Sequence, residues 1–333
     1  MRLLSILLTA GIIFSSCTAG AFAEGETAQD GDITLTDAAS VLGDGTSALS
    51  TDYSAYLAAN EGADYAEQDI SIEINQTVTD TPVDIPVTVQ EAGLYSLGFL
   101  YKAADESTTA LEFSVSLDGA LPFDEARKFS LSRIYTNEKG GNRVDGLGNE
   151  FTAKQVPYDE YYFACVTDIT KWTNDPYYIF LTAGEHKITL TKSVGEFSIK
   201  TLTLGAKEEP EKYAAPDKSE IYKGKPIIIE GEDAKVKTSY WLGGKSDNSS
   251  DTVTPNSTTK TVVNYIGGGN WKTNGETLAW ETPELKEGYY ALGFMYRQSA
   301  ILGAKVYRSL KIDGVTPFAE ANEIGFSYSY KWE

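Results

Sequence analysis

The stretch GLYSLGFLY at residues 93–101 decides the fold, because a closely similar stretch, GYYALGFMY, follows at residues 288–296. The two stretches lie 195 positions apart (93 to 288), and the same offset aligns LDG at 117–119 with IDG at 312–314 without a gap. Self-similarity at one fixed spacing is the sequence signature of a repeated structural unit. The sequence therefore predicts two tandem copies of one unit.

Within the first copy, large apolar residues alternate with smaller ones over residues 95–101 and 113–117, which is the period of a half-buried strand. An Asp-Gly pair at 118–119 predicts a tight hairpin turn after the second of these strands. A short helix is expected at 51–60, and further strands at 177–181, 186–190 and 197–202. Several short strands separated by turns indicate an all-β fold of two tandem jelly-roll β-sandwiches.

The predicted organisation has five parts. They are a signal peptide at 1–23, a flexible acidic leader at 24–50, a first sandwich at 51–205 (unit one), a linker at 206–222 and a second sandwich at 223–333 (unit two). By the same offset Glu333 corresponds to Glu138, so unit two has no counterpart of residues 139–204. We therefore expect unit two to be truncated at its C-terminus and the chain to be the N-terminal piece of a longer protein.

The N-terminus has the features of an export signal. Arg2 precedes an apolar stretch at 3–14, and Ala21-Phe22-Ala23 fits cleavage between small residues. The apolar stretch is shorter than the about 20 residues that span a bilayer. A lipoprotein signal is the alternative, in which Cys17 would be lipidated and would anchor the protein to a membrane. Both alternatives predict an extracellular or cell-surface protein.

The charge balance limits the partners. The formal net charge is −20, from 48 acidic and 28 basic residues, and such a field repels nucleic acid and anionic membranes. Neutral glycans and Ca²⁺ remain compatible with it. The only histidine, His186, begins a predicted strand, so a histidine-dependent triad or a multi-histidine zinc site is not expected. The chain is predicted not to be an enzyme.

Three further stretches resemble the galactose-binding-like carbohydrate-binding modules, those of families 6 and 35 in particular. They are IIIEGEDA at 227–234, WKTNGE at 271–276 and AGEH at 183–186. The resemblance implies a jelly-roll sandwich and covers most of both units. Two such units behind an export signal also resemble the N-terminal region of large secreted solute-binding proteins of sugar transporters.

The resemblance also implies a structural Ca²⁺ beside the first strand of the module. Glu230 and Glu232 match the motif that supplies its ligands, and carboxylate oxygens suit this hard cation. In a strand, alternate side chains share a face, so both carboxylates would reach one ion. The alternative is a solvated acidic edge.

Candidate sugar-binding residues combine aromatic rings, which stack on the apolar face of a pyranose, with amides that bind its hydroxyls. The candidates in unit two are Trp241, Tyr265, Trp271, Asn270 and Asn274, and the candidate in unit one is Trp172. The alternative is that these aromatic rings fill the end of the sandwich.

Three functions therefore stay open. The first is a non-catalytic carbohydrate-binding region of a longer secreted protein, linked to sugar uptake or glycan degradation. The second is a structural or protein-interaction spacer without a sugar site, and the third is an enzyme. Solvent-exposed tryptophans at loop tips favour the first, buried tryptophans favour the second, and two convergent acids in a pocket favour the third.

Overall fold

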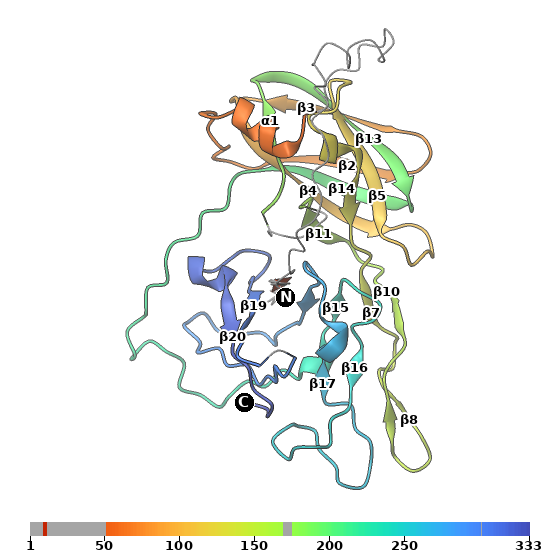
Figure 1. The fold of residues 1–333 in the computed structure, drawn as a ribbon, viewed down its shortest axis with the longest axis vertical. Coiled ribbons are helices and arrows are strands. Elements are labelled where there is room, and N and C mark those ends of the chain that lie inside the picture. Colours follow the sequence, from red (N-terminus) through yellow and green to blue (C-terminus); the bar gives the residue numbers. More distant parts are fainter. Residues whose placement is uncertain (1–8, 12–50, 169–174, 301) are drawn as a thin grey trace, which may run out of the picture.

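The computed structural model describes residues 9–11, 51–168, 175–300 and 302–333. In this part of the chain the one α-helix is α1 (Tyr53–Ala59), and nearly all other regular structure is β. Figure 1 shows a β-sandwich and a second, more irregular body below it. Over the same residues, no helix has the length and apolar character needed to cross a membrane.

The sandwich consists of two antiparallel sheets from unit one. The first sheet has the order β11-β4-β14-β2, with β12 also paired to β4; its strands are β2 (Ile70–Val78), β4 (Gly93–Ala103), β11 (Tyr162–Cys165), β12 (Tyr178–Leu181) and β14 (Phe197–Gly205). The second has the order β3-β13-β5-β6, formed by β3 (Val83–Val89), β13 (Gly184–Val194), β5 (Leu111–Leu117) and β6 (Phe129–Leu131). The predicted all-β jelly-roll sandwich is confirmed.

The core lies between the two sheets and follows the alternation in the sequence. In β3 every second residue is buried and its neighbours are exposed, as a strand with one solvated face requires. Phe99 from the first sheet and Phe113 from the second are fully buried, with ring centroids 5.5 Å apart in a T-shaped contact. Phe197 packs on Phe113 at 5.2 Å. These contacts hold the two sheets together through dispersion and burial of apolar area.

Helix α1 confirms the predicted helix and protects a sheet edge. Asp52 caps it by accepting a hydrogen bond from the Ala55 amide at 2.7 Å. The hydroxyl of Tyr53 accepts a hydrogen bond from the backbone amide of Tyr178 at 2.9 Å. The hydroxyl of Tyr56 accepts one from the backbone amide of Phe180 at 2.7 Å. The helix therefore satisfies amides on β12 that would otherwise be open to pairing with another chain.

Unit two contains shorter elements. Its strands are β15 (Val236–Lys237), β16 (Gly244–Lys245), β17 (Tyr265–Ile266), β18 (Leu278–Ala279), β19 (Val306–Ser309) and β20 (Ile324–Phe326), and its 3₁₀ turns are η3 (Gly231–Asp233), η4 (Gly268–Asn270) and η5 (Ala319–Asn322). Strand β1 (Thr9–Gly11) pairs with β19. A small core of its own includes Leu242, Leu278, Trp280 and Leu310.

The 195-residue offset recurs in the geometry of the two units. Asp118 and Asp313 both have a φ of 51°, and the glycines that follow have φ of 84° and 86°, so both Asp-Gly pairs form the same left-handed turn. The turn η2 (Asp124–Arg127) has its counterpart in η5. Strands β5 and β6 pair in the same register as β19 and β20.

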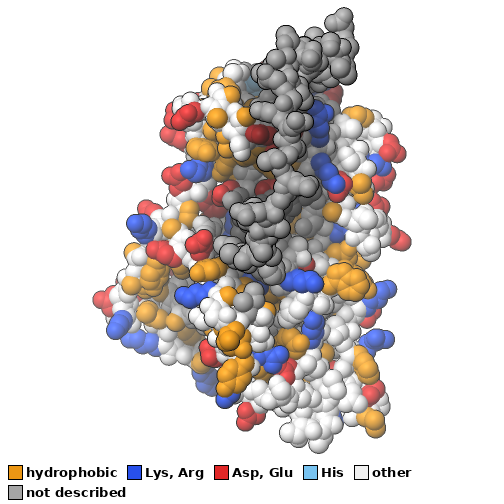
Figure 2. Space-filling model, in the orientation of Figure 1, with side chains coloured by type: hydrophobic (Ala, Val, Ile, Leu, Met, Phe, Trp, Pro, Cys, Tyr) orange, Lys and Arg blue, Asp and Glu red, His pale blue; other side chains and the backbone are white. Residues whose placement is uncertain are grey.

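Two stretches of unit two, in which the repeat and the family resemblance imply strands, do not form them. Residues 288–296 repeat the pattern of β4 but contain no strand, and residues 227–234 are extended up to η3 rather than paired. In unit one, β4 pairs with β11, β12 and β14, and β2 pairs with β14. Among the described residues, unit two supplies no strand in those places, and residues 288–296 make isolated contacts instead, a bridge between Tyr289 and Ile221 and two backbone hydrogen bonds between Tyr296 and Glu333. Leu292 and Met295 are consequently 51% and 58% exposed, and Figure 2 shows apolar side chains at the surface of the lower half of one face.

A long excursion of unit one reaches unit two, which the sequence did not predict. We call residues 135–157 the arm; it contains β7 (Tyr135–Asn137), β8 (Arg143–Val144), β9 (Glu150–Phe151) and β10 (Gln155–Pro157). One four-stranded sheet runs in the order β10-β7-β15-β18 and so contains strands of both units (Figure 1). Beside it, Ile134 packs with Val236 and Ala279 in a small apolar cluster. The two units therefore share a sheet in addition to the linker.

The Phe113→Ala variant tests the sandwich core. Removal of this buried ring is expected to lower the free energy of unfolding by about 3–5 kcal/mol, through lost burial and the cavity that remains. Urea denaturation measures it, with Phe151→Ala as the control because Phe151 is half exposed. Equal destabilisation by the two substitutions would contradict the core described here.

Candidate functional site

A hollow of about 290 Å³ lies where the arm meets unit two. We call it the Trp241 hollow. The arm supplies four consecutive residues, and unit two supplies two aromatic side chains, the strand β16 with the glycine before it, and one asparagine. The full lining is Thr152, Ala153, Lys154, Gln155, Tyr240, Trp241, Gly243, Gly244, Lys245 and Asn270. Neither unit forms this hollow alone.

The aromatic wall of the hollow is a pair of neighbouring rings. Trp241 is 70% exposed and Tyr240 is 38% exposed, and their rings meet edge to face with centroids 5.4 Å apart. Tyr240 also contacts Tyr135 of the arm at 5.7 Å. On the other side, Asn270 donates a hydrogen bond from Nδ2 to the carbonyl oxygen of Trp241 at 3.0 Å. The Trp241 indole thus stays largely exposed to solvent, while the contacts of Tyr240 with Tyr135 and of Asn270 with the Trp241 carbonyl hold this segment in place.

The arm is fixed to unit two by close polar contacts. The hydroxyl of Thr152 donates to the carbonyl oxygen of Gly244 at 2.6 Å. A Cβ atom at Gly243 would lie 3.0 Å from the Thr152 Cγ2 atom, so glycine at this position permits the approach. Farther along, the amide of Glu150 donates to Thr261 at 2.8 Å.

Gln155 is the most deeply buried polar residue of the lining, with 6% of its surface exposed. Its Nε2 atom donates to Asn137 Oδ1 at 2.8 Å and to the Ala153 carbonyl oxygen at 2.9 Å. Its Oε1 atom is buried and has no hydrogen-bond partner among the described residues. A buried carbonyl without a partner costs free energy, so a donor that reaches it would be stabilised.

A buried lysine shares a hydrogen-bond acceptor with Gln155. Lys237 is fully buried in β15 and donates from Nζ to Asn137 Oδ1 at 2.6 Å. Burial lowers the pKa of Lys237 to about 8. Asn137 therefore accepts from both Lys237 and Gln155, which links the arm to unit two through one oxygen atom.

The structure brings two of the six predicted sugar-binding residues, Trp241 and Asn270, into this hollow. Trp271 instead packs against the core of unit two. Its Nε1 atom donates to the Glu276 carbonyl oxygen at 3.2 Å, and the Arg308 guanidinium lies 4.4 Å from its ring centroid. The Trp271 side chain is thus held by contacts within unit two.

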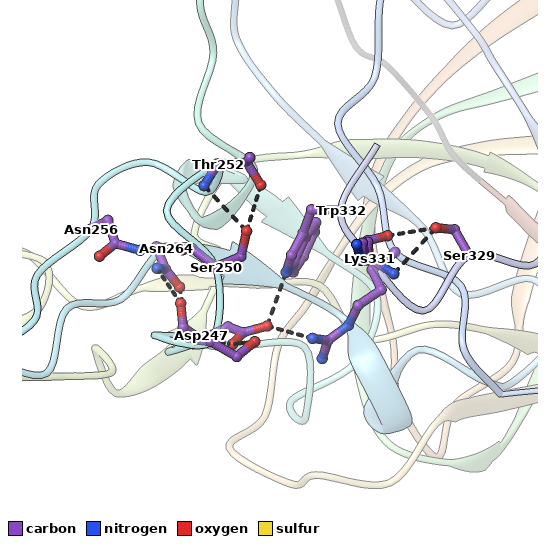
Figure 3. A network of polar contacts seen from close by, with 10 residues as sticks. Asp247, Ser250, Thr252, Asn256, Asn264, Ser329, Lys331 and Trp332 are labelled. Carbon is purple, nitrogen blue, oxygen red and sulfur yellow. Dashed lines mark hydrogen bonds and ion pairs between the residues drawn. The ribbon is translucent and has the colours of Figure 1, made fainter.

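Tyr265 lies in β17 with its ring 5.6 Å from that of Trp332. Figure 3 shows Trp332 pointing toward Asp247, which accepts hydrogen bonds from the indole at 2.9 Å and from Arg297 at 2.6 Å. Burial acts to raise the pKa of Asp247, but hydrogen bonds, led by that from Ser249, lower it to about 2. This network ties the loop after β16 to the C-terminal residues, and Tyr265 belongs to it.

Asn274 is half-buried and is not among the residues that line the hollow, and Trp172 lies outside the described residues. Sequence reasoning missed Tyr240 and the arm residues Thr152 and Gln155. Tyr240 could have been found, because it directly precedes Trp241. The arm residues carry no motif, and only the tertiary contact brings them to the hollow.

The predicted calcium ligands are arranged differently from the expectation. Glu230 precedes the 3₁₀ turn that contains Glu232, so the strand alternation that would align the two carboxylates is absent. Burial, together with three neighbouring carboxylates, raises the pKa of Glu232 to about 7, and its Oε2 atom has no hydrogen-bond partner in the part of the chain that the structure describes. Ca²⁺ takes six to eight oxygen ligands, and within the described ranges no three Asp, Glu, His or Cys side chains are grouped to hold a metal. These residues do not by themselves fit the ion, and calcium here stays a prediction.

Comparison with known proteins gives remote likenesses. No family model and no curated protein matches the chain. Among solved structures, it is similar to a family 35 carbohydrate binding module from Clostridium thermocellum, at 12% identity over 42% of this chain and 94% of that one, with a TM-score of 0.20. It is also similar to a Podospora anserina GH26-CBM35 β-(1,4)-mannanase, at 12% identity over 46% of this chain, with a TM-score of 0.24.

A third similar structure is the catalytic unit of a GH87 α-1,3-glucanase from Streptomyces thermodiastaticus, at 14% identity over 51% of this chain, with a TM-score of 0.24. The chain spans 29% of the length of the mannanase and 31% of the length of the glucanase. The strand pairing of the chain itself defines its fold.

The Lys237→Met variant tests the buried amine. Because the folded chain holds the pKa of Lys237 below its usual value, the unfolded chain binds more protons between about pH 8 and pH 10.5. The free energy of unfolding of the natural chain therefore gains a contribution that rises with pH in that window, and the variant lacks it. At pH 7 the variant is expected to be more stable, by about 2 kcal/mol.

Urea denaturation at pH 7, 8, 9 and 10 measures the difference between the two proteins. Asn137 keeps its hydrogen bond from Gln155 in the variant, so no acceptor is left unpaired. A variant that is less stable at pH 7, with a pH profile parallel to that of the natural chain, would refute the assignment.

Proposed function

We propose that this protein binds carbohydrate, without catalysis, at the Trp241 hollow. The observation that carries the proposal is the exposed ring of Trp241 in a hollow that is also lined by Gln155, whose buried Oε1 atom has no partner among the described residues. Sugar ligands present both chemistries that such a site requires. The C–H face of a pyranose stacks on an indole, and its hydroxyls donate hydrogen bonds.

The remaining lining groups complement these two. Lys154, Lys245 and Asn270 add donors around the hollow, and glycines at 243 and 244 leave its floor free of side chains. Of the residues that the structure describes, those that line the hollow include no Asp or Glu. Glycoside hydrolysis generally uses a pair of carboxylates, so the lining supports binding rather than bond cleavage.

The proposal extends to the setting of the protein. The export pattern at residues 1–23 supports secretion, with lipidation at Cys17 as the alternative, and the net charge of −20 disfavours nucleic acid. We place the chain in a longer secreted or cell-surface protein that takes up sugars or degrades glycans. Its partner is then an oligosaccharide or a polysaccharide.

A second candidate function is a spacer or protein-interaction module. The packing of Trp271 and Tyr265 within unit two favours it, because these two rings then serve the fold rather than a ligand. The exposed Trp241 is the observation that ranks sugar binding first.

The Trp241→Ala variant tests the proposal by affinity electrophoresis in gels that contain soluble xylan, mannan, pectin or glucan. The natural chain is expected to be retarded by at least one of these polysaccharides. The variant is expected to bind at least ten-fold more weakly, because the stacking of the Trp241 indole ring on the sugar face is lost. Tyr330→Ala is the matched control, since Tyr330 is largely exposed and lies outside the hollow.

A glycan array extends the same comparison to oligosaccharides. If the folded natural chain binds no glycan on the gels or on the array, the spacer function replaces sugar binding. If Trp241→Ala and Tyr330→Ala bind as tightly as the natural chain, any sugar site lies elsewhere.

A further inference from the structure

We propose that Glu208 is a positioning residue for the Trp241 hollow, because it fixes unit two to unit one at a second place, apart from the arm. The arm and unit two each supply part of the lining, so the hollow is complete only while the two units keep one relative orientation. This inference rests on the proposed carbohydrate binding and deepens it, since it concerns how that site is held together.

The chain crosses from unit one to unit two between Lys207 and Glu208. The backbone amide of Ala206 still donates to Asp69 Oδ1 of unit one, at 2.7 Å. The Nζ atom of Lys207 lies 4.4 Å from the centroid of the Tyr65 ring, also of unit one. The next residue, Glu208, already contacts unit two. A flexible linker lets two domains move independently, whereas this crossing is held on both sides.

Glu208 holds unit two through both oxygen atoms of its carboxylate. Its Oε1 atom accepts a hydrogen bond from the backbone amide of Thr316 at 2.6 Å, and its Oε2 atom lies 3.3 Å from the Nζ atom of Lys311. The Lys311 and Glu208 side chains are 32% and 42% exposed, and ion pairs so open to solvent contribute little. Thr316 is buried, and a hydrogen bond to a carboxylate is stronger than one between neutral groups. The Thr316 amide is therefore the main contact.

The segment after Glu208 is fastened to unit two in the way that the start of α1 is fastened to unit one. In unit one, the carbonyl oxygen of Thr51 accepts a hydrogen bond from the amide of Asp124 at 2.9 Å. The amide of Tyr53 donates to Glu125 Oε2 at 3.0 Å, and the Tyr53 ring packs on Phe123 with centroids 4.8 Å apart. Two hydrogen bonds and one ring contact thus join this segment to the turn η2.

The same three contacts recur at η5, the counterpart of η2 in unit two. The carbonyl oxygen of Glu211 accepts a hydrogen bond from the amide of Ala319 at 2.7 Å. The amide of Tyr213 donates to Glu320 Oε2 at 2.8 Å, and the Tyr213 ring packs on Phe318 with centroids 5.0 Å apart. Residues 211–213 are therefore fastened to unit two ahead of its predicted start at 223, and they support the contact that Glu208 makes.

Unit two is thus attached to unit one at two separate places. In Figure 1 the segment 206–222 runs along the left of unit two, and the arm lies on its right. The arm alone would be a weak attachment, because its strands are only two or three residues long. With Glu208 in place unit two cannot pivot about the arm, so the two parts of the lining stay together.

The Glu208→Ala variant tests the proposal by affinity electrophoresis in the same polysaccharide gels. It is expected to bind about five-fold more weakly than the natural chain, because only the molecules with unit two in place can bind. Glu208→Gln keeps an oxygen atom that accepts the Thr316 amide, so it is expected to bind within about two-fold of the natural chain. Glu220→Ala is the matched control, since Glu220 is an exposed acidic residue of the same segment.

Amide hydrogen exchange of the unliganded proteins gives a second readout, at the other attachment. The backbone amides of Glu150, Thr261 and Val263 donate hydrogen bonds across the contact between the arm and unit two. Their exchange is expected to be about five-fold faster in Glu208→Ala, because the contact opens more often. Exchange at Leu111–Leu117, inside the sandwich, is expected to stay unchanged. A purely local role of Glu208 would not alter exchange at the arm.

Unchanged exchange at the three arm-contact amides of Glu208→Ala would overturn the proposal. Faster exchange at Leu111–Leu117 as well would also overturn it, since the effect would then be general destabilisation. Equal affinities of Glu208→Ala and Glu220→Ala, or a Glu208→Gln variant that binds as weakly as Glu208→Ala, would count against it in the same way. If the natural chain binds no glycan, the proposed function fails, and exchange in the unliganded protein still decides whether Glu208 holds the arm against unit two.

Discussion

Backbone hydrogen bonding across strand edges is the constraint on which the rest of this structure depends. A strand inside a sheet needs a partner on each side, and unit one meets that need for β4, β5, β13 and β14. Its core then closes as a consequence, with the aromatic rings of two sheets in contact. Unit two carries the same strand pattern without the same partners, and residues 288–296 accordingly form isolated backbone contacts rather than a strand. One sequence pattern thus gives two local structures, according to what lies beside it.

The same constraint explains which parts of the fold were predictable. Alternation and the Asp-Gly turn are local properties, so the strands of unit one and the turn at Asp118 followed from the sequence. The strand at 227–234 did not form, because pairing is a non-local property that the motif does not encode. The arm was not predictable either. Its strands are only two or three residues long.

The candidate site shows a similar division. Residue type and loop position selected Trp241, Trp271 and Tyr265 together, since all three are aromatic and lie between predicted strands. Packing separates them, because Trp271 and Tyr265 find protein partners while Trp241 faces solvent. Gln155 could not be selected from the sequence, since its importance comes from an oxygen atom that burial leaves without a partner. Its position there depends on Asn137 and Thr152, through contacts that join distant segments.

The shared sheet between the arm and unit two has a consequence for how such a chain evolved. Duplication of a sandwich yields two copies of whatever surface the parent had, whereas the hollow described here is formed by the two copies together. It requires the arm, which lies between β6 and β11 of the first copy, to rest on the second, so a single copy could not form it. Selection on that surface acts on two copies jointly, and it would oppose any later recombination that exchanged either one alone.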